Sequence, residues 1–237
     1  MTLVNYCLDD KIERGIAKLG IQSFDTHRMI IMSISGILNA LTLILSCIAL
    51  MGSSNEAEHI INYSWVYSIL PTNDKKNSMV YIGLKKVVVR DENGHIEDIN
   101  WSDCGTTTYC DKNCEQVGKD ASNVLILAAL ISIPLVVLSF IRASKVLDKY
   151  DGYKIIGVNF ALISFLAFTI AVGEFSDECY SHLPSSHEFL YGPGFKVASV
   201  GLIFQIVNFI IHVGTPMSLN RDVYKSDFND LEGLNSS

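Results

Sequence analysis

The sequence predicts a membrane α-helical protein, a four-transmembrane-helix bundle with an extracellular antiparallel β-sheet in its first outer loop. The first observation is that four apolar stretches, residues 29–51, 123–141, 155–172 and 197–213, contain no Asp, Glu, Lys or Arg. A helix of ~20 apolar residues crosses a bilayer core of ~30 Å and satisfies its own backbone hydrogen bonds there. The second is an alternating apolar pattern in the long segment between the first two stretches. The third is the position of the cysteines, described below.

Lys and Arg are distributed in a way that predicts cytoplasmic termini, because cytoplasmic loops carry an excess of these residues. The connector between the second and third stretches holds Arg142, Lys145, Lys149 and Lys154, and the N-terminal arm holds Lys11, Arg14, Lys18 and Arg28. The connector after the third stretch has no Lys or Arg before Lys196. We therefore expect a multi-pass protein of the plasma membrane with both termini in the cytoplasm.

These features divide the chain into three parts. Residues 1–28 form a cytoplasmic arm, in which Leu8, Ile12, Ile16 and Leu19 at helical spacing predict a short amphipathic helix on the inner membrane face. Residues 29–214 form the bundle, including a β-rich outer loop (52–122) and a short outer loop (173–195) that we expect to be irregular. Residues 215–237 form a polar cytoplasmic tail with a composition typical of disorder.

Cysteine placement agrees with this orientation. Four of the six cysteines fall in the two outer segments: Cys104, Cys110, Cys114 and Cys179. An oxidising compartment favours disulfides there, and four cysteines allow three connectivities. The close spacing of the first three favours one local bridge, which would leave one cysteine to tie the long loop to Cys179. A zinc site with four thiolates is the alternative; we otherwise expect no metal or cofactor.

Two N-glycosylation sequons lie in the long outer segment. They are Asn62-Tyr63-Ser64 and Asn100-Trp101-Ser102, and each asparagine is a candidate glycan acceptor.

The long outer segment has the pattern of β structure. Residues 59–70 alternate apolar and polar side chains, which predicts a strand with Asn62 on its polar face. Residues 79–90 predict a second strand, and Asp91–Gly94 has the composition of a tight turn. Residues 95–101 would return antiparallel to the second strand.

Each predicted membrane helix carries small or polar residues at helical spacing. Candidate helix-packing residues are Asn39, Gly157, Gly201, Gln205 and Asn208. Such stripes mark faces that pack against other helices, where close approach and interhelical hydrogen bonds hold a bundle together. The alternative is that Asn39, Gln205, Asn208 and His212 line a transport path, but ion pathways usually contain intramembrane acids or bases.

A catalytic site is not expected. His182 and His187 lie near acidic residues in the short outer loop, but no nucleophile, HExxH or nucleotide-binding motif accompanies them. Nucleic-acid binding is also not expected, because phosphate recognition needs clustered Lys and Arg and the formal net charge is −7.

The arrangement resembles the claudin and peripheral-myelin-protein superfamily of four-helix membrane proteins, which also includes channel accessory subunits and amastin-like microbial proteins. The first outer loop of that group typically has a Trp, then Gly-Leu-Trp, then two cysteines. Trp65 matches the first element and Gly83-Leu84 the second without its final Trp, while Cys104 with Cys110 or Cys114 could supply the disulfide. The missing Trp, the long hairpin after Leu84 and the third cysteine indicate a distant member.

The resemblance implies a function in recognition at the membrane. We expect a non-enzymatic accessory subunit or scaffold of a larger membrane complex, with other integral membrane proteins and lipids as partners. A claudin-like adhesion or barrier protein that polymerises is the first alternative, and a small self-assembled channel is the second.

Overall fold

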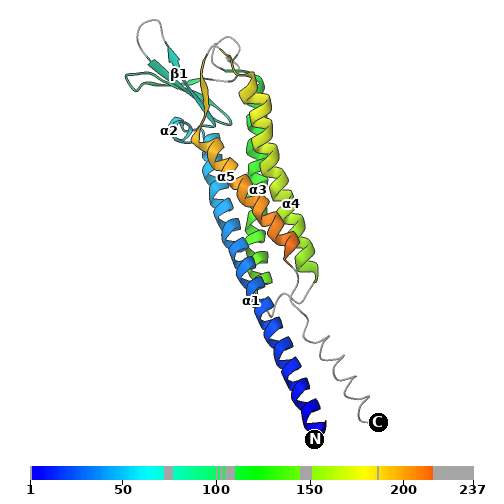
Figure 1. Cartoon of the computed structure of the whole chain (residues 1–237). Coiled ribbons are helices and arrows are strands. Elements are labelled where there is room, and N and C mark those ends of the chain that lie inside the picture. The colour runs from blue at the N-terminus through cyan, green and yellow to red at the C-terminus, as the bar shows by residue number, and fades with distance from the viewer. Residues whose placement is uncertain are drawn as a thin grey trace.

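The computed structural model describes residues 2–71, 77–99, 101, 104, 110–144, 151–185 and 187–215. It places a small antiparallel sheet at one end of a bundle of four long helices (Figure 1). We call this the sheet end and the other the opposite end.

Four helices build the bundle: α1 (Thr2–Leu50), α3 (Asn113–Ala143), α4 (Asp151–Glu174) and α5 (Pro193–Gly214). Within the described residues, four segments are long and apolar enough to cross a membrane, namely Thr26–Ser53, Asn113–Ala143, Gly152–His182 and Pro193–Gly214. Large apolar side chains such as Leu130 and Ile210 are exposed on their outer faces. The prediction of a multi-pass membrane protein is thereby confirmed.

The four helices pack in a ring, in which each helix contacts two neighbours. Helix α1 packs against α3 and α5, and α4 packs against the same two helices from the other side. The residues turned toward the interior are mostly small or polar, which lets neighbouring backbones approach closely.

The N-terminal arm differs from the prediction. A short separate helix on the membrane face is expected from residues 8–19, but α1 is one continuous helix from Thr2 to Leu50 and extends beyond the other helices (Figure 1). No proline interrupts residues 2–50. Extending a helix is easier than nucleating a new one, so the helix of the first apolar stretch continues through the arm.

The sheet has the strand order β4-β3-β2-β1-β5, and every neighbouring pair is antiparallel. Its strands are β1 (Val66–Pro71), β2 (Asn77–Ile82), β3 (Val87–Arg90), β4 (Ile96–Ile99) and β5 (Phe189–Tyr191). The predicted turn lies between β3 and β4. Gly94 has a φ of 81° there, which favours glycine, and Asp91 accepts a bond from the His95 backbone N–H at 2.7 Å.

The first strand was predicted too long and with the wrong face buried. A 3₁₀ turn, η1 (Met51–Ser53), and a short helix, α2 (Ala57–Asn62), precede β1. Within β1, Val66 and Ser68 are buried, whereas Ile69 is 54% exposed. The inner face of β1 can hold a serine because Ser68 donates a hydrogen bond to the Glu188 carbonyl oxygen at 2.8 Å.

The described residues between α4 and α5 form regular elements, contrary to the prediction of an irregular loop. Helix α4 continues as a π-helical turn, η3 (Phe175–Cys179), and a 3₁₀ turn, η4 (Tyr180–His182). Strand β5 then pairs with β1 and completes the sheet. Helix α5 begins at Pro193, a residue whose fixed φ suits the first turn of a helix.

Candidate functional site

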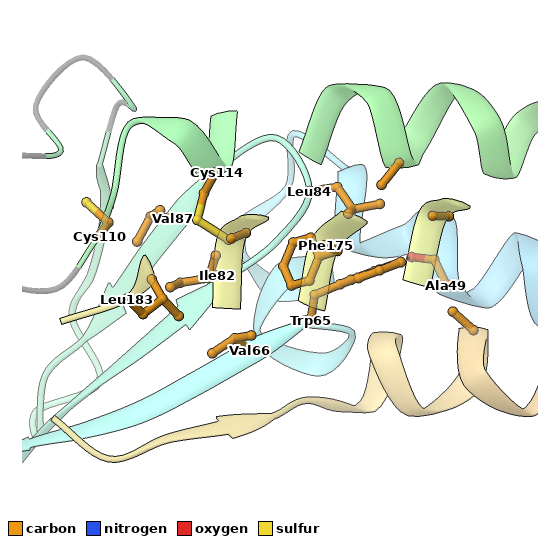
Figure 2. Close-up of a cluster of buried hydrophobic side chains, with 14 of the residues drawn as sticks. Ala49, Trp65, Val66, Ile82, Leu84, Val87, Cys110, Cys114, Phe175 and Leu183 are labelled. Carbon is orange, nitrogen blue, oxygen red and sulfur yellow. Dashed lines mark hydrogen bonds between the residues drawn. A yellow bond between two sulfur atoms is a disulfide. The ribbon is translucent and has the colours of Figure 1, made fainter. Parts of the chain in front are cut away.

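Trp65 is the centre of the junction between the sheet and the helices. Its side chain is fully buried directly before β1, and its indole N–H donates to the Ala49 carbonyl oxygen in the last turn of α1 at 3.2 Å. Figure 2 shows the ring lying between Ala49 and Phe175. The ring centroids of Trp65 and Phe175 are 4.7 Å apart in an edge-on arrangement. A single tryptophan therefore contacts α1 and the end of α4 from the start of the sheet.

Two glycines let the backbone approach this tryptophan. A Cβ at Gly52 would lie 2.9 Å from Trp65 Cδ1, and one at Gly194 would lie 2.8 Å from the same atom. Gly194 also donates its backbone N–H to the Ser64 carbonyl oxygen at 2.9 Å. The starts of η1 and α5 are thus fixed against the same ring, and neither position has room for a side chain.

An aromatic stack extends the junction along the segment before α5. Tyr180 and Tyr191 stack with centroids 4.1 Å apart, Tyr191 and Phe195 follow at 4.2 Å, and Phe195 meets Trp65 edge-on at 5.7 Å. The Tyr191 hydroxyl bonds Ser176 at 2.8 Å. These contacts join β5 to the ends of α4 and α5.

Cys104, Cys110, Cys114 and Cys179 form two disulfides, as the sequence indicated. Cys104 pairs with Cys110 across six residues, and Cys114 at the start of α3 pairs with Cys179 across 65 residues. The second bond is drawn in Figure 2 beside the buried face of the sheet. It joins α3 to the end of α4. The zinc alternative is wrong for this arrangement, because the bonded sulfurs are not thiolates.

The sheet face turned away from the core is largely apolar. Strand registers place Tyr67, Tyr81 and Leu190 in one row across β2, β1 and β5, and Ile69 and Met79 in the next. Ile69 is 54% and Leu190 46% exposed. We call these five side chains the outward face. Tyr67, Met79 and Tyr81 beside them are half-buried. Exposed apolar side chains that lie beside one another on a folded sheet are typical of surfaces that bind another molecule.

The outward face has a charged border on the side of β3 and β4. Arg90 is exposed and pairs with Met79 on one side and Ile96 on the other. Asp98 on β4 is the cross-strand partner of Val88 and forms an ion pair with Lys86 at 2.8 Å. An apolar centre with a polar rim is the usual composition of a protein-binding patch.

Within the bundle, three of the predicted packing residues bond one another. Asn39 Oδ1 on α1 accepts from Asn208 Nδ2 at 3.0 Å and from Gln205 Nε2 at 3.4 Å, both on α5. Asn39 Nδ2 donates to Ser139 Oγ on α3 at 3.3 Å, and Ser35 Oγ donates to Asn208 Oδ1 at 3.0 Å. All five side chains are buried. Their polar atoms bond one another, and these bonds link the three helices α1, α3 and α5.

The predicted packing glycines lie at contacts between α4 and α5. A Cβ at Gly157 would lie 2.8 Å from His212 Nδ1, and one at Gly201 would lie 2.7 Å from Phe168 Cε1. Both glycines therefore allow an aromatic or imidazole ring of the neighbouring helix to pack against their backbone.

Arg142 is a buried residue whose role the sequence did not indicate. Its guanidinium donates to His212 Nδ1 at 3.0 Å and to the Thr215 carbonyl oxygen at 2.9 Å, just after the C-terminus of α5. A guanidinium has only donors, so Nδ1 must accept and the imidazole proton is on Nε2, which lies 3.3 Å from Ser139 Oγ. Arg28 of α1 donates to the Arg142 carbonyl oxygen nearby. Two buried arginines and a histidine from three helices thus meet at the opposite end.

The remaining predicted residues lie near the junction or on the surface. Gly83 and Leu84 follow β2, where the Leu84 backbone N–H donates to the Gly52 carbonyl oxygen at 2.8 Å. Asn62 is exposed at the end of α2, a position open to a glycan, and Asn100 lies outside the described residues. His182 is exposed in η4 and contacts Ser181 and the Glu178 carbonyl oxygen.

Comparison of the chain with models of known protein families gives no match, and comparison with curated protein sequences gives none either. The resemblance to the claudin superfamily therefore stays a prediction.

Proposed function

We propose that this protein is a non-enzymatic accessory subunit or scaffold of a larger membrane complex, and a distant member of the claudin-like superfamily. The observation that carries the proposal is the outward face, Tyr67, Ile69, Met79, Tyr81 and Leu190, an apolar surface held on a braced sheet next to the membrane. Trp65 connects that sheet to α1 and to Phe175 at the end of α4, and the Cys114–Cys179 disulfide joins α3 to the same end of α4. A surface held in this way keeps its shape when a partner binds, so little ordering cost opposes binding.

The interior of the bundle supports binding over transport. The side chains of Gln205 and Asn208 donate hydrogen bonds to Asn39. The four apolar stretches contain no acidic residue. An ion crossing this interior would meet neither a carboxylate nor a free row of acceptors. The polar residues therefore act as interhelical contacts.

The orientation belongs to the same proposal. With the sheet outside the plasma membrane and both termini in the cytoplasm, both disulfides and the exposed Asn62 lie in the compartment where oxidation and glycosylation occur. The partner is then another integral membrane protein that lies alongside the helices and covers the outward face, while lipid contacts the remaining exposed apolar side chains.

The test is purification from native membranes in mild detergent, followed by crosslinking and mass spectrometry. The wild-type chain should bring down a stoichiometric larger membrane protein, with crosslinks near the outward face. The variant Ile69→Asp/Leu190→Asp should lose that partner. The variant Asn93→Asp/Glu92→Gln, which moves one negative charge by one residue within the exposed β3–β4 turn, should retain it.

Other outcomes would favour the alternatives. Recovery of differently tagged copies of the chain with no larger partner would support the adhesion polymer. Ionic currents from the purified protein in liposomes would support the channel.

A further inference from the structure

Most hydroxyl groups of the spanning helices bond their own helix. Thr42, Ser46, Ser132, Ser139 and Thr169 each donate to the carbonyl oxygen four residues earlier, at 2.8–2.9 Å. This is the ordinary way for a serine or threonine to be satisfied inside a helix. Ser164 on α4 differs: it is fully buried, and its Oγ has no hydrogen-bond partner among the described residues.

The contacts between α4 and α5 show what Ser164 faces. Gly157 is in contact range of His212, and Phe168 is in contact range of Gly201. Ser164 lies seven residues after Gly157, and Gln205 lies seven residues before His212. Seven residues are about two helical turns, so both side chains stay on the facing sides. Because the helices are antiparallel, Ser164 and Gln205 occupy the same level between the two contacts.

Gln205 has a buried acceptor without a partner, whereas Ser164 has a buried hydroxyl donor without one. Gln205 is fully buried and donates its Nε2 to Asn39 on α1, while its Oε1 has no hydrogen-bond partner among the described residues. The oxygen and nitrogen of a carboxamide point in diverging directions, so Oε1 is turned away from Asn39. Leaving a buried acceptor unpaired is unfavourable, and so is leaving a buried hydroxyl unpaired.

We propose that Ser164 and Gln205 form a binding site for one ordered water molecule between α4 and α5. The water donates one O–H to Gln205 Oε1 and accepts the Ser164 hydroxyl proton. Buried waters commonly pair polar groups that have no protein partner. A cation is a poorer occupant, because the apolar stretches contain no carboxylate to offset its loss of hydration.

This site gives α4 a polar connection to the rest of the bundle. From Lys154 to Gly173, the described side-chain hydrogen bonds of α4, from Asn159 and Thr169, stay within the helix itself. Through the water, Ser164 would be joined to Gln205 and from there to Asn39 on α1.

The direct test is a structure of the full chain in lipid nanodiscs at a resolution that shows ordered water. A density peak at hydrogen-bond distance, about 2.7–3.2 Å, from both Ser164 Oγ and Gln205 Oε1 supports the proposal. It is overturned if no peak lies between them, whether Ser164 bonds Gln205 directly or turns to the Phe160 carbonyl oxygen.

A double-mutant cycle gives an independent readout. Ser164→Ala and Gln205→Met should each lower the melting temperature by about 2–4 °C, and the double variant should be lowered by clearly less than the two shifts combined, because it leaves no unpaired atom. The matched control is Ser132→Ala, whose buried hydroxyl bonds its own helix. Its shift should add to that of Gln205→Met, and additive shifts for Ser164→Ala as well would contradict the water site.

Discussion

Trp65 donates its indole N–H to the Ala49 carbonyl oxygen across 3.2 Å, so the residue that starts the sheet is bonded to the last turn of a membrane helix. The Ala49 carbonyl is one of the acceptors that a helix C-terminus leaves without an intrahelical partner. One bond therefore satisfies the end of α1 and fixes the position of β1.

Replacing Trp65 with Phe should destabilise the junction. The variant loses the N–H donor and part of a buried ring, and we expect a loss of about 1–3 kcal/mol in the free energy of unfolding. Thermal unfolding in detergent measures this loss. Ile69→Ala is the control, since that exposed side chain on β1 should change stability by less than about 0.5 kcal/mol. Equal effects of the two substitutions would show that Trp65 is not a structural anchor.

Gly194→Ala should also be destabilising. Its Cβ would lie 2.5 Å from the Tyr63 carbonyl oxygen and 2.8 Å from Trp65 Cδ1. Backbone must move to accommodate it, at a cost of about 1–3 kcal/mol. Gly173→Ala is the matched control, because nothing lies within 4 Å of a Cβ there and alanine favours a helix. Equal stability of the two variants would contradict the close packing around Trp65.

The two disulfides should differ in their contribution to stability. Cross-links that close longer loops restrict the unfolded chain more. The expected contribution is about 4 kcal/mol for Cys114 and Cys179, which are 65 residues apart, and about 2 kcal/mol for Cys104 and Cys110, which are six residues apart. The variant Cys114→Ser/Cys179→Ser should therefore melt at a lower temperature than Cys104→Ser/Cys110→Ser. The reverse order would mean that the long-range bridge is not formed in the folded protein.

Arg142→Lys should weaken the opposite end of the bundle. A lysine ammonium cannot reproduce the two directed bonds from one guanidinium to His212 Nδ1 and Thr215 O. We expect a loss of about 1–3 kcal/mol, seen as a lower melting temperature. The same substitution at the exposed Arg90 should have little effect. An unchanged melting temperature for Arg142→Lys would show that a positive charge is sufficient there and that the directed bonds of the guanidinium are not needed.

The sequence predicted the helices well, because a charge-free stretch of about 20 apolar residues has few other interpretations. The turn at Gly94 was also predictable, since Asn-Gly favours the positive φ that the structure has. The buried face of β1 was not. A period of two shows that a strand has two faces, and it cannot tell which face meets the core when Tyr67 and Ile69 lie outside.

Two further features could not be predicted from the sequence, because they depend on tertiary contacts. Strand β5 has only three residues between Pro184 and Pro193, so its sequence resembles a loop until β1 offers a partner. Arg142 resembles an ordinary cytoplasmic charge at the end of a helix, and its burial depends on acceptors from α5 that lie about 70 residues away in the sequence. The unpaired atoms of Ser164 and Gln205 likewise follow only from the packing of α4 on α5.

The proposed function requires a sheet that lies outside the cell and a C-terminus that lies inside. Labelling of intact cells with a membrane-impermeant maleimide tests this directly, in a chain where Cys7 and Cys47 are serine and one new cysteine replaces Asn93 in the β3–β4 turn or Ser226 in the tail. We predict that Asn93→Cys is labelled on intact cells and that Ser226→Cys is labelled only after permeabilisation. Labelling of Ser226→Cys on intact cells, with Asn93→Cys protected, would contradict the orientation and the proposed recognition surface.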